Sequence, residues 1–463
     1  MVVSGTVRIR AVGAGVPAGR LDAAEVAAAW GERGKGRVAV CRDDEDVLTL
    51  GWQAADRALT AANQSPADVD GLWWGTSRPP YAEGPSHATL AAALGLSPTS
   101  GGALLSGSPH SGIEALLSAA DAIAAGSSRL ALVIVSDALL PQLGSALERR
   151  AGAGAAALLL SAADGPATLG RRTTRTEPVL DRYRGDRERD TRDTYDSRLF
   201  REETFLPMVS AVGADLTADG APATWSAPDP DGRLGKTVGK RLGGTLGSAG
   251  VFEALGDTGA AAALLGALSS LTSPGDVGVI AFGGGRSTGL IVSVVSSVPG
   301  AADVDALLRT GQTMTYAEVL RARGQLVAGG ETVPMGVPPG SAQFTRGSRE
   351  MLQLLGARCV DCGVINTPPT IHPHCISCGG AKFTEVGLAR TGTVQTFAVN
   401  HTMPAPFVAP LPLAVVDLDD GARVMLQVAD NLELEVGTPV RLVLRRYAYE
   451  RGAPVYGWKA ARP

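Results

Sequence analysis

The chain has 463 residues, of which 45% are hydrophobic and 19% are charged, a balance typical of globular proteins. Its 42 basic and 46 acidic side chains give a formal net charge of -4, so we expect neither a nucleic-acid binder nor a polybasic membrane-surface protein. No stretch approaches the roughly 20 apolar residues of a membrane-spanning helix. The opening residues MVVSGTVRIR are unlike a signal peptide, and we therefore expect a cytoplasmic protein without a membrane partner.

The first 300 residues alternate between strand-like and helix-like segments. In chain order we expect a strand at 6–16, helices at 47–62 and 112–126, a strand at 130–137, and a closing strand pair at 277–285 and 290–298. This alternation predicts a layered α/β core. Runs of small residues such as AGAGAAALLL (151–160) indicate that its helices and strands pack closely.

Two segments interrupt or follow this core. Residues 171–203 carry ten arginines and nine acidic residues, and we expect a solvated excursion or a subunit contact, because the charges nearly cancel. Residues 300–349, which include the Gly- and Pro-rich stretch VPMGVPPGS (333–341), are expected to form a connector that packs between the core and a C-terminal module.

Four of the five cysteines lie within twenty residues of one another, with the spacing C-x2-C-x12-C-x2-C. Two such knuckles place four thiolates around a tetrahedral ion, so Cys359, Cys362, Cys375 and Cys378 predict a structural Zn2+ site with no open coordination position. Two disulfides fit poorly with a cytoplasmic chain. His372 and His374 lie between the knuckles, but four cysteines already complete the shell. Because metal binding at such sites is folding energy, zinc removal is expected to unfold this module first.

After the knuckles, short alternating strands separated by Gly, Asp and Pro turns predict a small antiparallel barrel (392–403, 411–430 and 437–461). A zinc ribbon followed by such strands resembles the acyl-CoA-associated proteins that carry a rubredoxin-like zinc hook and an OB-fold. The resemblance covers about 350–463 and rests on CVDCG, PHCISCGG, RTGTVQTFAV and VVDLDDGARVMLQV. It implies a zinc ribbon at 350–388 and an OB-fold at 389–463. A basic groove with stacking aromatics is missing from this pattern, so nucleic-acid binding is not expected.

The core resembles the thiolase superfamily, and most closely the archaeal and bacterial hydroxymethylglutaryl-CoA synthases. The matching stretches are 7–31, 43–59, 75–96, 111–137 and 279–294. The resemblance implies two related βαβαβ halves, 1–165 and 166–299, packed as a five-layered α-β-α-β-α core that usually forms a homodimer. It also implies chemistry in which a cysteine holds an acyl group while a second acyl thioester reacts.

The residues that carry this chemistry in the family are replaced here. Pro109 stands at the nucleophile position, Ser226 at the position of the catalytic His, and Asp257 at that of the Asn in the later Gly-Asn-Thr motif. Ser77, ahead of the retained Pro80-Tyr81, replaces an acidic residue. Loss of a nucleophile that works as one unit with its base costs on the order of 10^6 in rate, so condensation through an acyl-cysteine is excluded. Cys41 does not substitute, because the acidic run that follows it would raise its thiol pKa.

Other groups in this region remain candidates for catalysis. His110 at the entrance of the 112–126 helix is a candidate general base, and Ser108 a candidate nucleophile if the two side chains converge; alternatively, His110 is bonded to backbone. Asp257 is a candidate base or orienting carboxylate, or a helix cap. Tyr81 completes the catalytic candidates. Gly283, Gly284 and Gly285 preserve a glycine loop whose N–H groups could polarise a thioester carbonyl.

Basic residues in GRLGKTVGKRLGG match the family's own basic helix. Lys236 and Lys240 are four residues apart and share a helical face, beside Arg233 and Arg241. The resemblance implies that they meet CoA phosphates or the pantetheine of an acyl carrier protein. A solvated helix face explains the same run.

Three functions follow from this pattern. The first is an enzyme of specialised metabolism, an acyltransferase or carbon–carbon bond-forming enzyme that passes a CoA- or carrier-bound acyl group directly to an acceptor. The second is a non-catalytic partner that binds an acyl chain or pairs with an active homologue. The third is a retro-aldol carbon–carbon lyase. The sequence names neither the acyl donor nor the acceptor.

Overall fold

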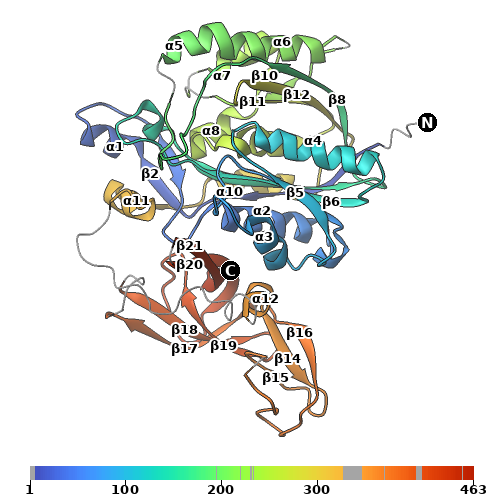
Figure 1. Cartoon of the computed structure of the whole chain (residues 1–463), viewed down its shortest axis with the longest axis vertical. Helices are drawn as coiled ribbons and strands as arrows, with labels where there is room; N and C mark the ends of the chain where they lie inside the picture. Colours follow the sequence, from blue (N-terminus) through green and yellow to red (C-terminus); the bar gives the residue numbers. More distant parts are fainter. Residues whose placement is uncertain are drawn as a thin grey trace. The chain divides into compact units, whose positions relative to one another are not determined.

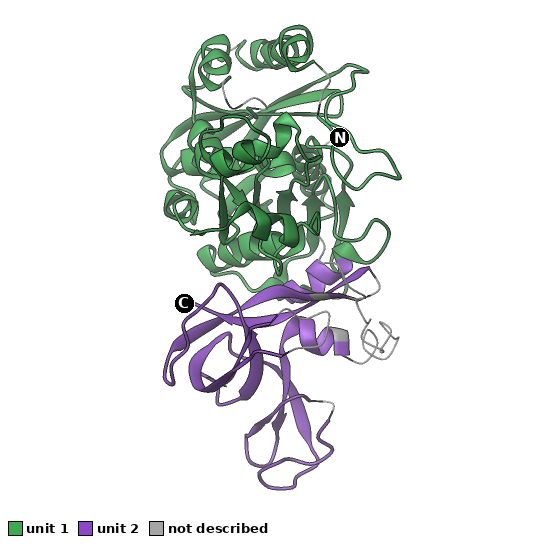
Figure 2. Cartoon of the chain, turned by 90° about the vertical axis from the view of Figure 1, so that its left-hand side faces the viewer, with its two compact units in different colours: residues 1–87, 96–327 green, residues 88–95, 328–463 purple. Residues whose placement is uncertain are grey.

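The structure is a computed structural model that describes residues 6–193, 196–218, 220–229, 232, 234–326, 347–369, 371–402, 409–450 and 452–463. The chain divides into two compact units, residues 1–87 with 96–327 and residues 88–95 with 328–463, shown in different colours in Figure 2. Arg233 and the stretch 333–341 lie outside the described residues.

The first unit contains a ten-stranded sheet made of two five-stranded halves with the same topology. The order is β5-β4-β6-β7-β1 in one half and β10-β9-β11-β12-β8 in the other. The first three strands of each order run parallel to one another, and the fourth strand, β7 or β12, is antiparallel to both of its neighbours. Within the sheet, the halves are joined where Arg8 and Ile9 of β1 pair with β8. The strands are β1 Arg8–Gly15, β4 Gly71–Gly75, β5 Gly101–Leu105, β6 Leu130–Ala138, β7 Ala153–Ser161, β8 Ala167–Thr176, β9 Thr224–Ser226, β10 Thr245–Leu246, β11 Gly275–Gly283 and β12 Arg286–Val294. This repetition confirms two related halves.

Helices cover both outer faces of these sheets and fill the space between them, as Figure 1 shows. Helix α2 packs on β1, β6 and β7, α6 packs on β8 and β12, and α4 and α9 lie between the two halves. This order of layers confirms the expected α-β-α-β-α core. The helices of this unit are α1 Ala23–Ala29, α2 Val47–Ala61, α4 Ser111–Ala124, α5 Ser197–Phe200, α6 Leu206–Leu216, α7 Gly235–Leu242, α8 Ala249–Leu255 and α9 Ala262–Leu268, with shorter turns at Pro66–Asp68, Ala146–Arg149, Arg201–Phe205, Gly259–Ala261 and Ser269–Thr272. Helix α3 (Ser86–Leu94) begins in this unit, and its residues from 88 onward belong to the second.

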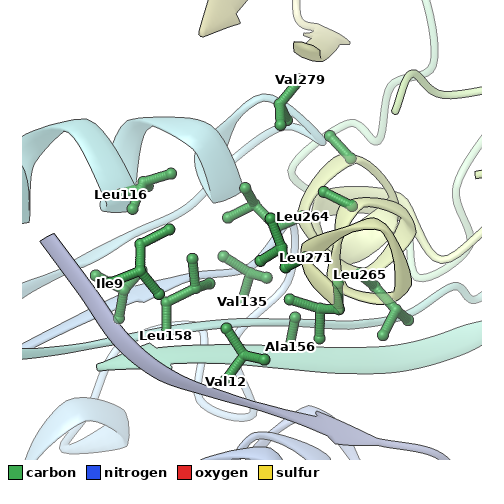
Figure 3. Close-up of a cluster of buried hydrophobic side chains, with 14 of the residues drawn as sticks. Ile9, Val12, Leu116, Val135, Ala156, Leu158, Leu264, Leu265, Leu271 and Val279 are labelled. Atoms are coloured by element: carbon green, nitrogen blue, oxygen red, sulfur yellow. The ribbon is translucent and has the colours of Figure 1, made fainter. Parts of the chain in front are cut away.

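A large apolar cluster of the first unit joins both halves through the two central helices, α4 and α9. Figure 3 shows Leu116 of α4 and Leu264 and Leu265 of α9 among side chains from the strands on either side. A Cβ at Gly112 of α4 would collide with the Ala260 carbonyl oxygen at the start of the α9 region. Small residues therefore allow the central helices to approach each other closely, as the sequence predicts.

Residues 301–326, the part of the expected connector that is described within the first unit, fold onto the core. They form a turn at Ala301–Asp303, α10 Val304–Leu308, β13 Gln312–Thr313 and α11 Tyr316–Ala322. Strand β13 pairs with β2 (Gly19–Asp22), which also pairs with β3 (Arg37–Val40) in a small separate sheet. This stretch is therefore an added layer of the core, and its packing against the barrel stays a prediction.

The second unit contains a ribbon and a barrel. Helix α12 (Ser348–Gln353) precedes a three-stranded sheet of β14 Leu355–Cys359, β15 Ile365–Asn366 and β16 Phe383–Gly387. A closed barrel follows, in the order β17-β18-β19-β21-β20, with β17 Thr391–Asn400, β18 Leu411–Leu418, β19 Arg423–Val428, β20 Pro439–Glu450 and β21 Ala453–Ala461. The expected barrel is confirmed with one correction: β19 and β21 pair in parallel, because closing a five-stranded barrel puts two strands of the same direction side by side.

Among the described residues, no helix combines the length and the apolar character needed to cross a membrane.

Candidate functional site

His110 directly precedes α4 and is buried, with 2% of the residue exposed. Its Nε2 lies 2.8 Å from the hydroxyl oxygen of Thr288 on β12. The Thr288 oxygen in turn lies 2.9 Å from the hydroxyl oxygen of Thr174 on β8. The His110 ring is therefore hydrogen-bonded to a side chain, and the alternative that it is bonded to backbone is wrong.

The other ring nitrogen of His110 faces a charged pair. Nδ1 lies 3.4 Å from Oε1 of Glu114, and Glu114 forms an ion pair with Arg286. Burial, and then the positive charge of Arg286, lower the pKa of His110 from its ordinary 6.5 to about 4. The imidazole is therefore unprotonated at neutral pH and able to accept a proton.

Helix and strand periodicities bring these groups together. His110 and Glu114 are four residues apart and share a face of the first turn of α4, while Arg286 and Thr288 are two apart and share a face of β12. Thr288 is the direct register partner of Thr174 on the neighbouring strand. Sequence analysis missed Thr288, Thr174, Glu114 and Arg286. The spacings within each element are visible in the sequence, but the pairing of the elements is not.

Ser108 does not form a dyad with the His110 ring. Its hydroxyl oxygen accepts a hydrogen bond from the main-chain N–H of His110 at 3.2 Å. The glycine loop packs against the same turn, since a Cβ at Gly283 would lie 2.9 Å from the main-chain nitrogen of His110 and 2.9 Å from Pro109 Cδ. Gly283 adopts a φ of 159°, and only a glycine allows so close an approach. The convergence that a Ser108 nucleophile requires is therefore not present.

The N–H of Gly284, a candidate oxyanion donor, is already engaged. It donates to Oδ2 of Asp181 at 2.9 Å. Asp181 is 6% exposed, and burial raises the pKa of its carboxyl group despite the hydrogen bond from Gly284 and the nearby Arg182. Asp181 belongs to the charged segment 171–203, so the prediction of a solvated excursion is wrong at this residue.

Asp257 is held by an ion pair. Its Oδ2 lies 2.6 Å from Nη2 of Arg182, and its Oδ1 accepts the N–H of Gly259 at 2.9 Å. The two side chains are only 10% and 12% exposed. Asp257, above all, raises the pKa of Arg182 despite burial of the guanidinium. Arg182, from the charged segment, is thus the partner of Asp257, and sequence analysis did not identify it.

Asp137, at the end of β6, is a further buried carboxylate that sequence analysis missed. Its Oδ2 accepts the N–H of Ser77 at 3.4 Å and that of Ala260 at 2.9 Å, so it joins the Ser77 turn to the start of the α9 region. The side chain is fully buried, and burial raises the pKa of its carboxyl group. Ser77 itself carries no carboxylate, but its main-chain N–H binds the carboxylate of Asp137.

The two remaining catalytic candidates have structural surroundings. The Ser226 hydroxyl, fully buried on β9, donates to the Ala263 carbonyl oxygen at 2.6 Å and so fastens α9 to the sheet. Tyr81 lies within the electrostatic reach of Asp46, the N-cap of α2, and burial together with that carboxylate raises the pKa of its phenol. The Tyr81 phenol is therefore protonated at neutral pH.

Two of the predicted docking residues line a cavity of about 500 Å³. Lys236 and Lys240 project from α7 beside Gly232 and Gly244, with Glu253 of α8 on another wall. Arg241 lies elsewhere on the helix, 3.5 Å from the Ser210 hydroxyl on α6. The structure thus separates Lys236 and Lys240 from Arg241, and Arg233 is outside the described residues.

The four ribbon cysteines converge. All four sulfur atoms lie within 4.8 Å of one another, with 3.6 Å between Cys359 and Cys378 and between Cys362 and Cys375. Hydrogen bonds from the N–H groups of Cys378 and Ser377 lower the pKa of Cys375 to about 6, which favours the thiolate that binds metal. The Asn366 amide, missed by sequence analysis, donates to Cys375 Sγ at 3.7 Å. Neither His372 nor His374 is part of this group of four.

Comparison with known proteins agrees with this division of the chain. A family model described as the C-terminal OB-fold domain of ChsH2 matches residues 385–445. The hydroxymethylglutaryl-CoA synthase of Pyrococcus horikoshii is 35% identical over 150 residues, which cover 32% of this chain and 43% of that relative. The chain thus spans less than half the length of that relative. The hydroxymethylglutaryl-CoA synthase of Aeropyrum pernix is 28% identical over 344 residues, 68% of this chain and 93% of the relative.

Solved structures of the same kind share the fold. MvaS in complex with 3-hydroxy-3-methylglutaryl coenzyme A superposes with a TM-score of 0.62 at 20% identity, over 72% of this chain and 94% of that one. The HMG synthase of the curacin biosynthetic pathway, in complex with its acetyl donor-ACP, gives 0.59 at 18% identity, over 74% and 94%. The chain therefore consists of a hydroxymethylglutaryl-CoA synthase-like core with the thiolase fold, followed by a C-terminal OB-fold domain.

Proposed function

We propose that the protein is a hydroxymethylglutaryl-CoA synthase-like acyltransferase of specialised metabolism that transfers an acyl group from a thioester directly to an acceptor, without an acyl-cysteine. The observation that supports this most is the place of His110, a buried imidazole at the helix entrance next to the position of the missing nucleophile. The base takes a proton from the acceptor as the acceptor attacks the thioester carbonyl, and returns it to the departing thiolate.

We propose that the thioester reaches the core with CoA or with an acyl carrier protein. Lys236 and Lys240 on the wall of the α7 cavity supply two positive charges for phosphate or pantetheine. The similar structures bind 3-hydroxy-3-methylglutaryl coenzyme A in one case and a donor-ACP in the other, by their descriptions. Glu253 on the opposite wall would exclude a second anion beside the phosphate.

We propose Zn2+ as the ion of the ribbon. The sulfur separations fit a tetrahedral all-thiolate shell, in which zinc–sulfur distances of about 2.3 Å place sulfurs roughly 3.8 Å apart. Cys359, Cys362, Cys375 and Cys378 would hold the ion, and the Asn366 amide would stabilise one thiolate. Zinc in such a closed shell supplies folding energy and no open position for chemistry.

A homodimer through the core is also part of the proposal. Strand β5 ends the N-terminal half of the sheet, and its residues Gly101, Gly102 and Ala103 are exposed. An exposed edge strand is a surface on which a second copy can add its own strand.

A second candidate function is a non-catalytic partner that binds an acyl chain or an active homologue. It is favoured by the ion pair of Asp257 with Arg182 and by the hydrogen bond of Gly284 to Asp181, because both engage groups that catalysis would use.

Turnover of acyl-CoA and acyl-carrier donors, in the wild type and in His110→Ala and Ser108→Ala, separates the two functions. We expect His110→Ala to lower kcat by about 100- to 10,000-fold, as loss of a general base does. Ser108→Ala should change kcat little, since Ser108 bonds to backbone. His401→Ala, an exposed histidine of the second unit, is the control. Equal activity of His110→Ala and the control would refute the assignment of the base. Absence of donor consumption, with co-purification of an active thiolase-like protein, would favour the partner.

The docking proposal is tested with the double variant Lys236→Glu/Lys240→Glu. We expect donor binding to weaken about 100-fold, because two charged hydrogen bonds contribute roughly 1.5 kcal/mol each. Arg241→Glu is the matched control, since it changes the charge of the same helix outside the cavity. Equal donor affinity in the double variant and the control, measured by calorimetry, would overturn the docking site.

A further inference from the structure

A chain of hydroxyl groups leads from the His110 ring to an exposed position on the sheet. Thr288 is fully buried on β12, and Thr174, its register partner on β8, is exposed. The oxygen of Thr288 is within hydrogen-bond distance of both His110 Nε2 and the Thr174 oxygen. These two threonines have no role in the function proposed above.

The charges around His110 favour one direction for these hydrogen bonds. Nδ1 lies 3.4 Å from Oε1 of Glu114, an ion-pair distance without a hydrogen bond, and a carboxylate paired with Arg286 favours a proton over a lone pair on the nitrogen that faces it. Nε2 then has a lone pair and accepts the proton of Thr288. Thr288 has donated its only proton, so Thr174 must donate to Thr288. The lone pairs of the Thr174 oxygen are left to accept a proton from outside.

Direct access to Nε2 is closed. The residue is 2% exposed, and both ring nitrogens face side chains of the protein. Nε2 itself lies 2.8 Å from the Thr288 hydroxyl oxygen. The Thr288 hydroxyl is therefore the group through which a proton reaches Nε2.

We propose that Thr174 and Thr288 form a proton relay to His110, and that the acyl acceptor gives up its proton at Thr174, on the exposed stretch of β8. The proposal rests on the proposed function in that His110 is its base. The acceptor N–H, O–H or C–H proton moves to Thr174 Oγ1, the Thr174 proton to Thr288 Oγ1, and the Thr288 proton to Nε2. Each hydroxyl is restored, and the Glu114 carboxylate lies 3.4 Å from the other ring nitrogen, Nδ1. The reverse sequence delivers the proton to the thiolate that leaves.

The relay is tested first without substrate. The chain has only five histidines, so the ring 15N signals of His110 are assigned from their loss in His110→Ala. We expect a protonated Nδ1 and an unprotonated Nε2 in the wild type. Thr288→Val, which keeps the side-chain shape and removes the hydroxyl, should shift the Nε2 signal. Thr174→Val should slow exchange of the Thr288 hydroxyl proton with water and leave the tautomer unchanged. A protonated Nε2 in the wild type, or equal exchange of the Thr288 hydroxyl proton in the wild type and in Thr174→Val, would overturn the relay.

Kinetics provide the second arm. In Thr288→Val we expect kcat to fall about 100-fold, as for loss of general-base assistance, with KM for the thioester unchanged. Thr288→Ser restores the hydroxyl and should recover kcat, which a purely structural role in packing would not produce. Thr176→Val, two residues along β8 and exposed, is the control and should behave as the wild type. Equal kcat for Thr174→Val and Thr176→Val would overturn Thr174 as the outer end. If the wild type turns over no thioester, the proposed function fails, and the NMR result still decides whether the relay exists.

Discussion

The four-cysteine ribbon and the candidate site of the core are assembled in opposite ways. In the ribbon, all four sulfur ligands come from two short turns within twenty residues, each followed by a glycine of positive φ, Gly363 and Gly379. In the core, the hydrogen bond between His110 and Thr288 joins residues that are 178 positions apart in the chain, and the one between Thr288 and Thr174 joins residues 114 positions apart. The comparison teaches that local spacing is sufficient for a closed metal shell, whereas the environment of a buried base depends on how distant elements pair.

Removal of the ribbon metal should have the largest effect and the most local one. Structural zinc contributes on the order of 10 kcal/mol of folding free energy, so chelation or Cys375→Ser should unfold the ribbon. NMR of the full chain would show loss of the ribbon signals, including those of Asn366, with the core signals retained. A ribbon that keeps its structure in excess chelator, at neutral pH, would contradict a structural metal.

The Arg182–Asp257 ion pair is the corresponding weak point of the core. Arg182→Met leaves a buried carboxylate without its partner, and we expect a loss of about 3 to 5 kcal/mol in the free energy of unfolding. The double variant Arg182→Met/Asp257→Asn removes the stranded charge and should recover most of that loss. Denaturant unfolding measures both variants. Similar stabilities for the single and the double variant would mean that the pair does not hold the charged segment onto the core.

His110 should make the stability of the core depend on pH. The folded-state pKa of about 4 lies below the ordinary 6.5, so the unfolded chain binds a proton that the folded chain does not. The contribution is fully present above pH 6.5 and is lost as pH falls towards 4, by roughly 3 kcal/mol. Unfolding of the wild type and of His110→Gln at several pH values in this window measures it. A parallel decline in both proteins would show that His110 titrates normally.

Much of the fold was predictable because its signals are periodic within each element. The alternating strands and helices and the spacing of the cysteines from Cys359 to Cys378 follow from local patterns. The charged segment 171–203 shows the limit. Its net charge is close to zero, from which we predicted solvent exposure. A net charge does not reveal which charged side chains form ion pairs or hydrogen bonds with the core. Asp181 and Arg182 are placed against Gly284 and Asp257, and these contacts are not visible in composition.

The sequence by itself determined the layered core, the ribbon with its four clustered cysteines, and the barrel. Only the tertiary structure decided what the remaining polar groups do. His110 turns to Thr288 and away from Ser108, and Asp257 is paired with Arg182. The physical reason is that a buried polar group must find a hydrogen-bond or charge partner, and which partner it meets is set by strand register and helix packing between elements far apart in the chain.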